Sequence, residues 1–196
     1  MKSTFIAVAL SAIFVGAASA APETFTIDTP HSFSHFEVTH LGINTIQGRF
    51  DKTSGEITLD RAAKQGSIQA EIDVNSVSTG YARRDDLLKT DDYFNAAKFP
   101  TMTFRSKTLR FKDDTLVGAD GELTLLGVTR PVSLEIASFK CINHPVNKRE
   151  LCGAVARTTI KRSDFGMTRA SRSLSDEIRI SINLEALKSS SGNPFR

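Results

Sequence analysis

Alternation of apolar and polar side chains with a period of two runs through most of the chain after residue 20. The apolar members of its clearest example are Ile178, Ile180, Ile182 and Leu184, with charged or polar residues between them. Successive side chains of a β-strand point to opposite faces, so this pattern predicts antiparallel strands with one buried and one solvated face. It recurs in about eight or nine segments joined by short turns, which predicts an all-β barrel or sandwich. Alternation alone does not decide between these two.

One segment, residues 78–97, breaks the alternation. Ser78 or Thr79 is placed to cap a short helix that would include Leu87 and Leu88. No linker or change of composition divides the remainder, so residues 21–196 are expected to form one domain with a short helical excursion.

The first twenty residues have the pattern of a secretory signal peptide. Lys2 precedes an apolar stretch over residues 5–15, and the small residues Ala18, Ser19 and Ala20 follow. Cleavage is expected after Ala20, with export to the periplasm. The apolar stretch is shorter than the about 20 residues that span a bilayer, so no stable membrane anchor is expected.

Charge and cysteine content narrow the functional classes further. The chain has 25 basic and 22 acidic residues, and only Lys2 leaves with the signal peptide. This balance gives no support for a nucleic-acid partner. The two cysteines, Cys141 and Cys152, have ten residues between them. In an oxidising compartment they are expected to form a disulfide that holds a hairpin together.

No residue cluster in the sequence indicates catalysis, a metal or a cofactor. Ser32 follows His31 directly, and adjacent strand residues point to opposite faces, so the two do not form a nucleophile and base pair. His31 and His35 are four residues apart, whereas a zinc site needs three or four convergent ligands. A metal-dependent or stress-related periplasmic enzyme that uses this histidine region remains the alternative to a binding protein.

The aromatic composition favours an apolar interior. The chain contains thirteen phenylalanines, two tyrosines and no tryptophan, and Phe5 and Phe14 fall within the signal peptide. Phenylalanine supplies bulk without a hydrogen-bonding group, which suits either a packed core or an apolar tunnel.

Ordered motifs between residues 28 and 167 resemble the YceI family of periplasmic, lipocalin-like, polyisoprenoid-binding proteins. They are Asp28-Thr29-Pro30-His31-Ser32, Gly48-Arg49-Phe50, Gly121-Glu122-Leu123-Thr124, Leu126-Gly127-Val128-Thr129-Arg130-Pro131-Val132 and Asp164-Phe165-Gly166-Met167, the last with Arg162 before it. The resemblance implies an extended eight-stranded antiparallel barrel with a helical flap. It also implies a pocket for a polyprenyl chain or the tail of an isoprenoid quinone, and neither catalytic residues nor a metal.

The alternation and the resemblance together suggest which side chains contact the ligand. The expected tail-lining residues are Phe33, Phe36, Val38, Ile72, Met102, Phe104, Leu123 and Leu125. Phe33 belongs with them only if the strand starts after it, because its parity is opposite to that of Phe36. The expected head-group end consists of His40, Arg84 and Arg162. A barrel plugged by its own side chains is the competing possibility, and pairing of two barrels into a homodimer is left open.

Overall fold

The computed structural model describes residues 21–190, so the expected signal peptide lies outside the described residues. The strands are β1 (Glu23–Ile27), β2 (Phe33–His40), β3 (Asn44–Phe50), β4 (Thr53–Asp60), β5 (Gln65–Asp73), β6 (Val77–Ser78), β7 (Thr101–Lys112), β8 (Thr115–Leu125), β9 (Val128–Asn143), β10 (Glu150–Lys161) and β11 (Leu174–Lys188). The helical elements are α1 (Ala82–Lys89) and the short 3-10 turns η1 (Thr29–His31), η2 (Val74–Ser76) and η3 (Arg162–Phe165).

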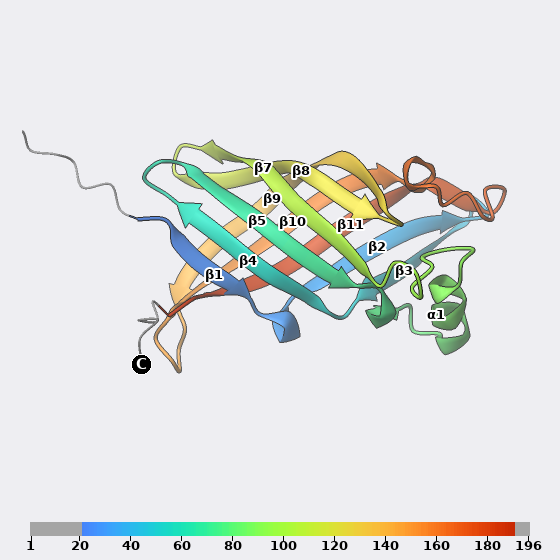
Figure 1. The fold of residues 1–196 in the computed structure, drawn as a ribbon, viewed down its shortest axis with the longest axis horizontal. Coiled ribbons are helices and arrows are strands. Elements are labelled where there is room, and N and C mark those ends of the chain that lie inside the picture. Colours follow the sequence, from blue (N-terminus) through green and yellow to red (C-terminus); the bar gives the residue numbers. More distant parts are fainter. Residues whose placement is uncertain (1–20, 191–196) are drawn as a thin grey trace, which may run out of the picture.

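Eight strands form a closed ring in the order β1-β4-β5-β7-β8-β9-β10-β11, and the pairing of β1 with β11 closes it. Neighbouring strands are antiparallel throughout. Figure 1 shows them inclined to the long axis of the molecule, as ring closure requires. The prediction of an eight-stranded antiparallel barrel with one short helix is confirmed, and the sandwich is excluded.

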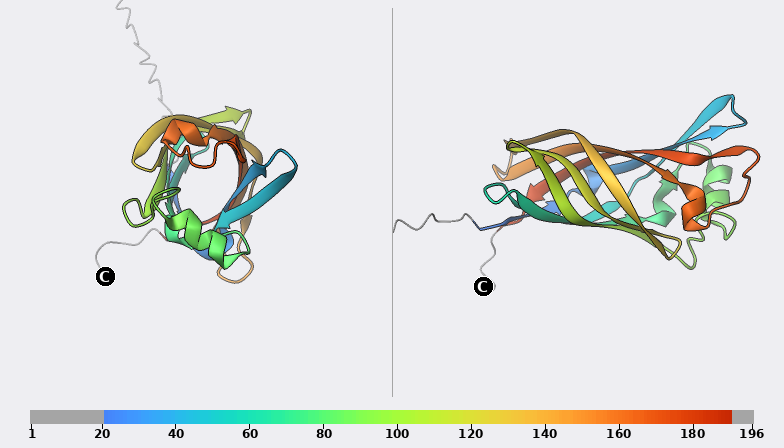
Figure 2. Two further views of the ribbon diagram at one scale, coloured as in Figure 1. Left: turned by 90° about the vertical axis from the view of Figure 1, so that its right-hand side faces the viewer. Right: turned by 90° about the horizontal axis from the view of Figure 1, so that it is seen from above.

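The barrel is long because two of its wall strands are long. β9 has 16 residues and β11 has 15, so each extends about 50 Å at about 3.3 Å per residue. β1 and β2 pair with successive stretches of β11 and are separated by η1. The hairpin of β2 and β3 thereby extends the wall past the ring and projects beyond it (Figure 2).

The two ends of the barrel differ. One end, here called the mouth end, carries α1, η3 and the β2–β3 hairpin; α1 lies at the rim of the ring when this end faces the viewer (Figure 2). The other end, the disulfide end, carries the chain start at β1 and the hairpin that joins β9 to β10 (Figure 1). Each end has its own buried cluster, one including Phe25 and Leu59 and the other Phe50 and Phe165.

Cys141 and Cys152 form the expected disulfide, with 2.02 Å between their sulfur atoms. They are directly opposed residues of β9 and β10, so the bond holds that hairpin together. Reducing it is expected to lower the free energy of unfolding by about 3 kcal/mol, because the short loop is no longer closed in the unfolded chain. Urea unfolding with and without dithiothreitol measures this loss. A Cys141→Ala/Cys152→Ala variant serves as the control insensitive to reductant, and identical midpoints for the oxidised and reduced wild type would contradict the expectation.

Candidate functional site

The interior of the barrel is a cavity with an apolar wall. Measured as the volume that the centres of water-sized molecules can occupy, it is about 230 Å³. Side chains from strands all around the ring line it, together with Leu88 of α1 and Phe94 of the segment after the helix. Alternation produces this wall, because every second residue of each strand faces inward.

Partial exposure of inward-facing side chains shows that the barrel is hollow. Along β11, Ile178, Ile180, Ile182 and Leu184 all border the cavity, and each is only partly buried. In a plugged barrel, neighbours across the axis would cover such residues. On the neighbouring strand β10, the small side chains of Ala154 and Ala156 border the same space and leave it open. The competing possibility of a filled interior therefore does not describe this molecule.

Most of the expected tail-lining residues border the cavity. They are Phe36, Val38, Ile72, Met102, Phe104, Leu123 and Leu125. Their contact with a ligand stays a prediction. Phe36 lies against Gly48 of the neighbouring strand. A Cβ atom at position 48 would lie 2.3 Å from the Phe36 ring, so glycine is needed there for the ring to keep its position.

Phe33 does not border the cavity, contrary to expectation. β2 begins at Phe33 itself, so its side chain has the opposite parity to Phe36 and takes the outer face. The guanidinium of Arg49 lies 5.1 Å from the centre of the Phe33 ring, and the His35 ring is 6.3 Å away. Phe33 is therefore part of an outer aromatic and basic cluster.

Arg162 borders the cavity at the mouth end and is buried, with 4% of its surface exposed. Its guanidinium donates hydrogen bonds to backbone carbonyls of the β10–β11 connection and of β11. The acceptors are the carbonyl oxygens of Met167 at 3.0 Å, Arg169 at 2.7 Å, Leu174 at 3.4 Å and Ser175 at 2.9 Å. These bonds already use all three guanidinium nitrogens, so Arg162 primarily holds the connection between β10 and β11 in place.

The structure does not bring the other two expected head-group residues to the cavity wall. His40 ends β2 on the projecting hairpin, opposite Asn44 and Leu174. Arg84 of α1 donates to the hydroxyl of Thr79 at 2.8 Å and to its carbonyl oxygen at 2.9 Å. Both residues belong to the mouth end but lie outside the lining of the cavity.

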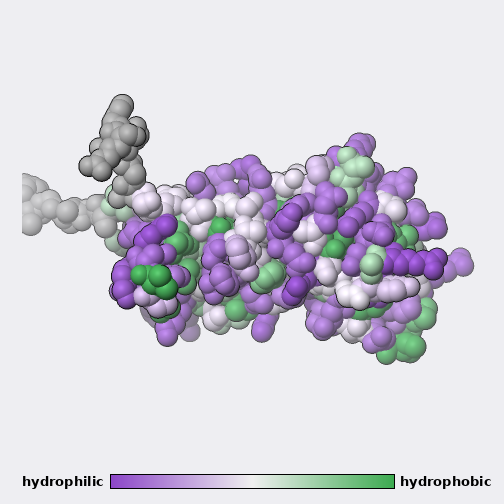
Figure 3. All heavy atoms as spheres, turned by 90° about the horizontal axis from the view of Figure 1, so that it is seen from below, coloured by the Kyte–Doolittle hydropathy of each residue, from purple (hydrophilic) through white to green (hydrophobic). Residues whose placement is uncertain are grey.

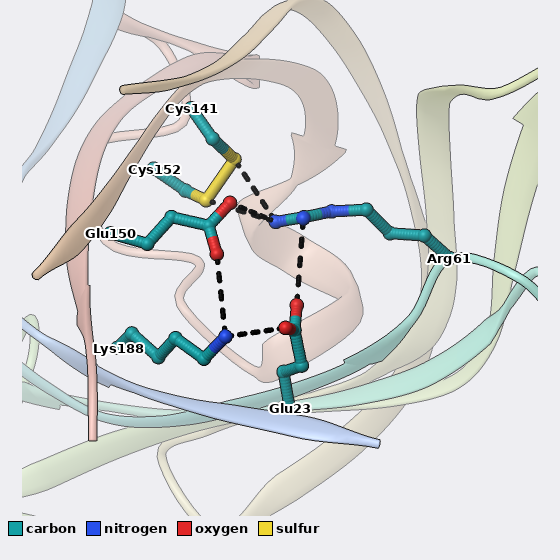
Figure 4. Close-up of a disulfide and its surroundings, with 6 residues drawn as sticks. All are labelled: Glu23, Arg61, Cys141, Glu150, Cys152 and Lys188. Carbon is teal, nitrogen blue, oxygen red and sulfur yellow. Dashed lines mark hydrogen bonds and ion pairs between the residues drawn. A yellow bond between two sulfur atoms is a disulfide. The ribbon is translucent and has the colours of Figure 1, made fainter. Parts of the chain in front are cut away.

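A network of ion pairs spans the disulfide end (Figure 4). Arg61, in the β4–β5 turn, lies 2.7 Å from Glu150 and 3.5 Å from Glu23. Lys188 contacts Glu23 and lies 3.6 Å from Glu150. The hydrogen bond with Glu23 raises the pKa of Lys188 above its ordinary value. Phe25 and Cys152, which border the cavity at this end, are buried.

Of the two histidines expected for the alternative, an enzyme, His35 is among the residues that border the cavity and His31 is not. His31 Nδ1 is 2.8 Å from Asp28, and this hydrogen bond raises the pKa of His31. Asp28, His31 and Glu185 have potential ligand atoms within 4.8 Å of one another. His35 is in neither group of potential metal ligands within residues 21–190, so the structure does not bring His31 and His35 into a shared centre.

The cavity also has lining residues that the sequence predictions omitted. Phe50, Leu88 and Phe94 lie at the mouth end, and Phe50 and Phe94 pack edge to face with ring centres 5.3 Å apart. The inward residues of β11 were visible in the alternation pattern. Leu88 and Phe94 had no such signal, because they come from the helical excursion and reach the cavity only through the way it folds over the rim.

The closed barrel and its apolar interior define the class: a hollow antiparallel β-barrel with an apolar internal cavity. The YceI-like domain family matches residues 25–186, and the chain belongs to this family. None of the helices within residues 21–190 has the length and apolarity needed to cross a bilayer.

Relatives and solved structures agree with this assignment. A UPF0312 protein of Pseudomonas paraeruginosa is 32% identical over 191 residues, which cover 96% of this chain and 99% of the relative. The crystal structure of BcnA from Burkholderia cenocepacia is 25% identical, with a TM-score of 0.68, and covers 81% of this chain and 98% of its own. A polyisoprenoid binding domain from Saccharophagus degradans is 21% identical, with a TM-score of 0.62, over 84% of this chain and 98% of its own.

Proposed function

We propose that the protein is a periplasmic carrier for a long isoprenoid lipid, either a polyprenyl lipid or an isoprenoid quinone, held inside the barrel. The observation that carries this proposal is the hollow cavity with its apolar wall. A slender hydrocarbon chain suits such a space because it needs width for only one line of carbon atoms. The solved domain from Saccharophagus degradans is described as polyisoprenoid binding, and this supports the same ligand class although its low identity establishes only the fold.

Burial of hydrocarbon is the driving force that this cavity offers. Each methylene group moved from water into the cavity contributes about 0.8 kcal/mol, before the loss of chain freedom is subtracted. The wall offers almost no hydrogen-bonding groups to a tail, so we expect little discrimination among tails of similar length. Selection would come from tail length and from contacts at the mouth end, and several isoprenoid lipids should bind.

Organic extraction of the natively purified protein, followed by mass spectrometry, tests the carrier function. The expected result is close to one equivalent of isoprenoid lipid per protein chain. An empty extract, at a sensitivity sufficient to see a stoichiometric ligand, would refute the proposal. The intact mass of the same sample tests the expected cleavage after Ala20, and recovery from the periplasmic fraction tests the location.

A further inference from the structure

The tip of the β2–β3 hairpin exposes two large apolar side chains. Leu41 is 57% exposed and Ile43 is 85% exposed, with Gly42 between them. Short turns ordinarily hold polar residues or glycine, and Leu41 even adopts a left-handed backbone conformation with φ of 53°. The backbone N–H of Ile43 donates to the carbonyl of His40 at 3.1 Å, so the turn is closed and presents both side chains outward. The hairpin projects beyond the barrel at the mouth end (Figure 2).

The helix at the same end adds to this apolar surface. Tyr81, just before α1, is 56% exposed, and Leu87 is 47% exposed, whereas the next residue, Leu88, borders the cavity. Figure 3 shows hydrophobic side chains among hydrophilic ones at the right-hand end of the molecule, which is the mouth end. Apolar side chains thus lie both on the wall of the cavity and on the outer surface beside it.

Basic side chains lie next to the hairpin tip. The β10–β11 connection, residues 162–173, contains three basic residues and one acidic residue, and Lys161 ends β10 just before it. Of these basic residues Arg162 is buried and the others are exposed. The backbone N–H of Leu41 donates to the carbonyl of Ser173 at 2.7 Å, which joins the hairpin tip to this connection. Arg172 is exposed and forms no ion pair with any described residue, while Arg169 lies 3.6 Å from Asp92. The tip therefore combines exposed apolar groups with neighbouring cationic ones, the combination that binds anionic membrane surfaces.

We propose that the mouth end docks on an anionic lipid bilayer, with Leu41 and Ile43 inserted at the interface. This inference rests on the proposed function, because docking lets an isoprenoid pass between the bilayer and the cavity without crossing water. Apolar contact provides the attachment, and the exposed side chains of Lys161, Arg169 and Arg172 contribute attraction to lipid phosphates. The attachment is reversible, since two inserted side chains fall far short of a permanent anchor.

The opposite end provides a matched control. Val146, in the β9–β10 hairpin, is 83% exposed, nearly the same as Ile43. It lies at the disulfide end, which holds the ion-pair network around Arg61 and Lys188. A substitution there removes an equally exposed apolar side chain at the opposite end of the barrel from Leu41 and Ile43.

Co-sedimentation of the purified protein with vesicles of phosphatidylethanolamine and phosphatidylglycerol tests the docking. The Leu41→Ser/Ile43→Ser variant is expected to bind about tenfold more weakly than the wild type, through the loss of two inserted side chains. Val146→Ser is expected to bind as the wild type does. Unfolding in urea should be the same for all three, because the altered residues are exposed.

The docking proposal would be overturned by unchanged vesicle binding in the double variant, or by an equal loss in Val146→Ser. Wild-type protein that sediments no better with vesicles than without them would overturn it as well. Failure of the proposed function is a separate result, because it appears as an empty lipid extract whether or not the protein binds vesicles.

Discussion

Protein carrying Ala154→Phe is expected to be purified without its lipid. Ala154 borders the cavity from β10, opposite Leu184 of β11 and Phe139 of β9. A benzyl group at this position extends into space that the tail would occupy. If it displaces about three methylene groups at about 0.8 kcal/mol each, affinity falls by more than about tenfold. Extraction and mass spectrometry measure the remaining occupancy.

The matched control is Ala137→Phe, which makes the same substitution at an exposed position of β9 that does not border the cavity. This variant should keep its lipid. Ala154→Phe should stay folded, with a free energy of unfolding within about 1 kcal/mol of the wild type, because the ring enters empty space and does not crowd a packed core. Full lipid occupancy in folded Ala154→Phe would show that the ligand does not lie in the cavity.

Arg162→Met is expected to lower the free energy of unfolding by at least about 3 kcal/mol, because it leaves four carbonyl groups without their donor in and around a buried site. The acceptors belong to residues 167–175, so the β10–β11 connection should lose its fixed conformation. Urea unfolding measures the effect. Arg162→Lys should not restore the lost stability, since one ammonium group cannot reproduce the planar set of guanidinium donors.

Arg169→Met is the control for this prediction. Arg169 is exposed, and its substitution is expected to change the free energy of unfolding by no more than about 0.5 kcal/mol. The comparison also separates two roles for Arg162. A structural role predicts lost stability, whereas a role in gripping a ligand head group predicts lost lipid in a protein of unchanged stability. The second pattern would contradict the interpretation of its hydrogen bonds given above.

Alternation was sufficient to predict the strands and most inward faces, because burial of one face of a sheet leaves a direct trace in the sequence. Ring closure left no such trace. It depends on three residue pairs between β1 and β11, which lie at opposite ends of the domain. Only the family resemblance distinguished the barrel from a sandwich. Phe33 was expected in the lining only if β2 started after it. The turn η1 ends at His31 and β2 already begins at Phe33, so Phe33 keeps the opposite parity to Phe36.

The candidate site was harder to predict than the fold, for two reasons. Whether a barrel is hollow depends on the summed volumes of its inward side chains, to which small residues such as Ala154 and Ala156 contribute little. Alternation carries no information about that sum. The role of Arg162 depends on backbone carbonyls, which are the same for every amino acid. The start of the helix was also not predicted exactly. Thr79, one of the two expected caps, donates its hydroxyl to Asp85 at 2.5 Å, but the N-cap position itself is taken by Tyr81, whose side chain makes no capping hydrogen bond.

The wall of the cavity offers almost no hydrogen-bonding groups along its length. A polar head group would lose its hydrogen bonds to water inside such a wall, so a lipid held there as proposed would enter tail first and leave in reverse. The depth of the cavity then sets the length of tail that can be buried. Any tail longer than that depth leaves its last units outside, where water or a neighbouring membrane must receive them.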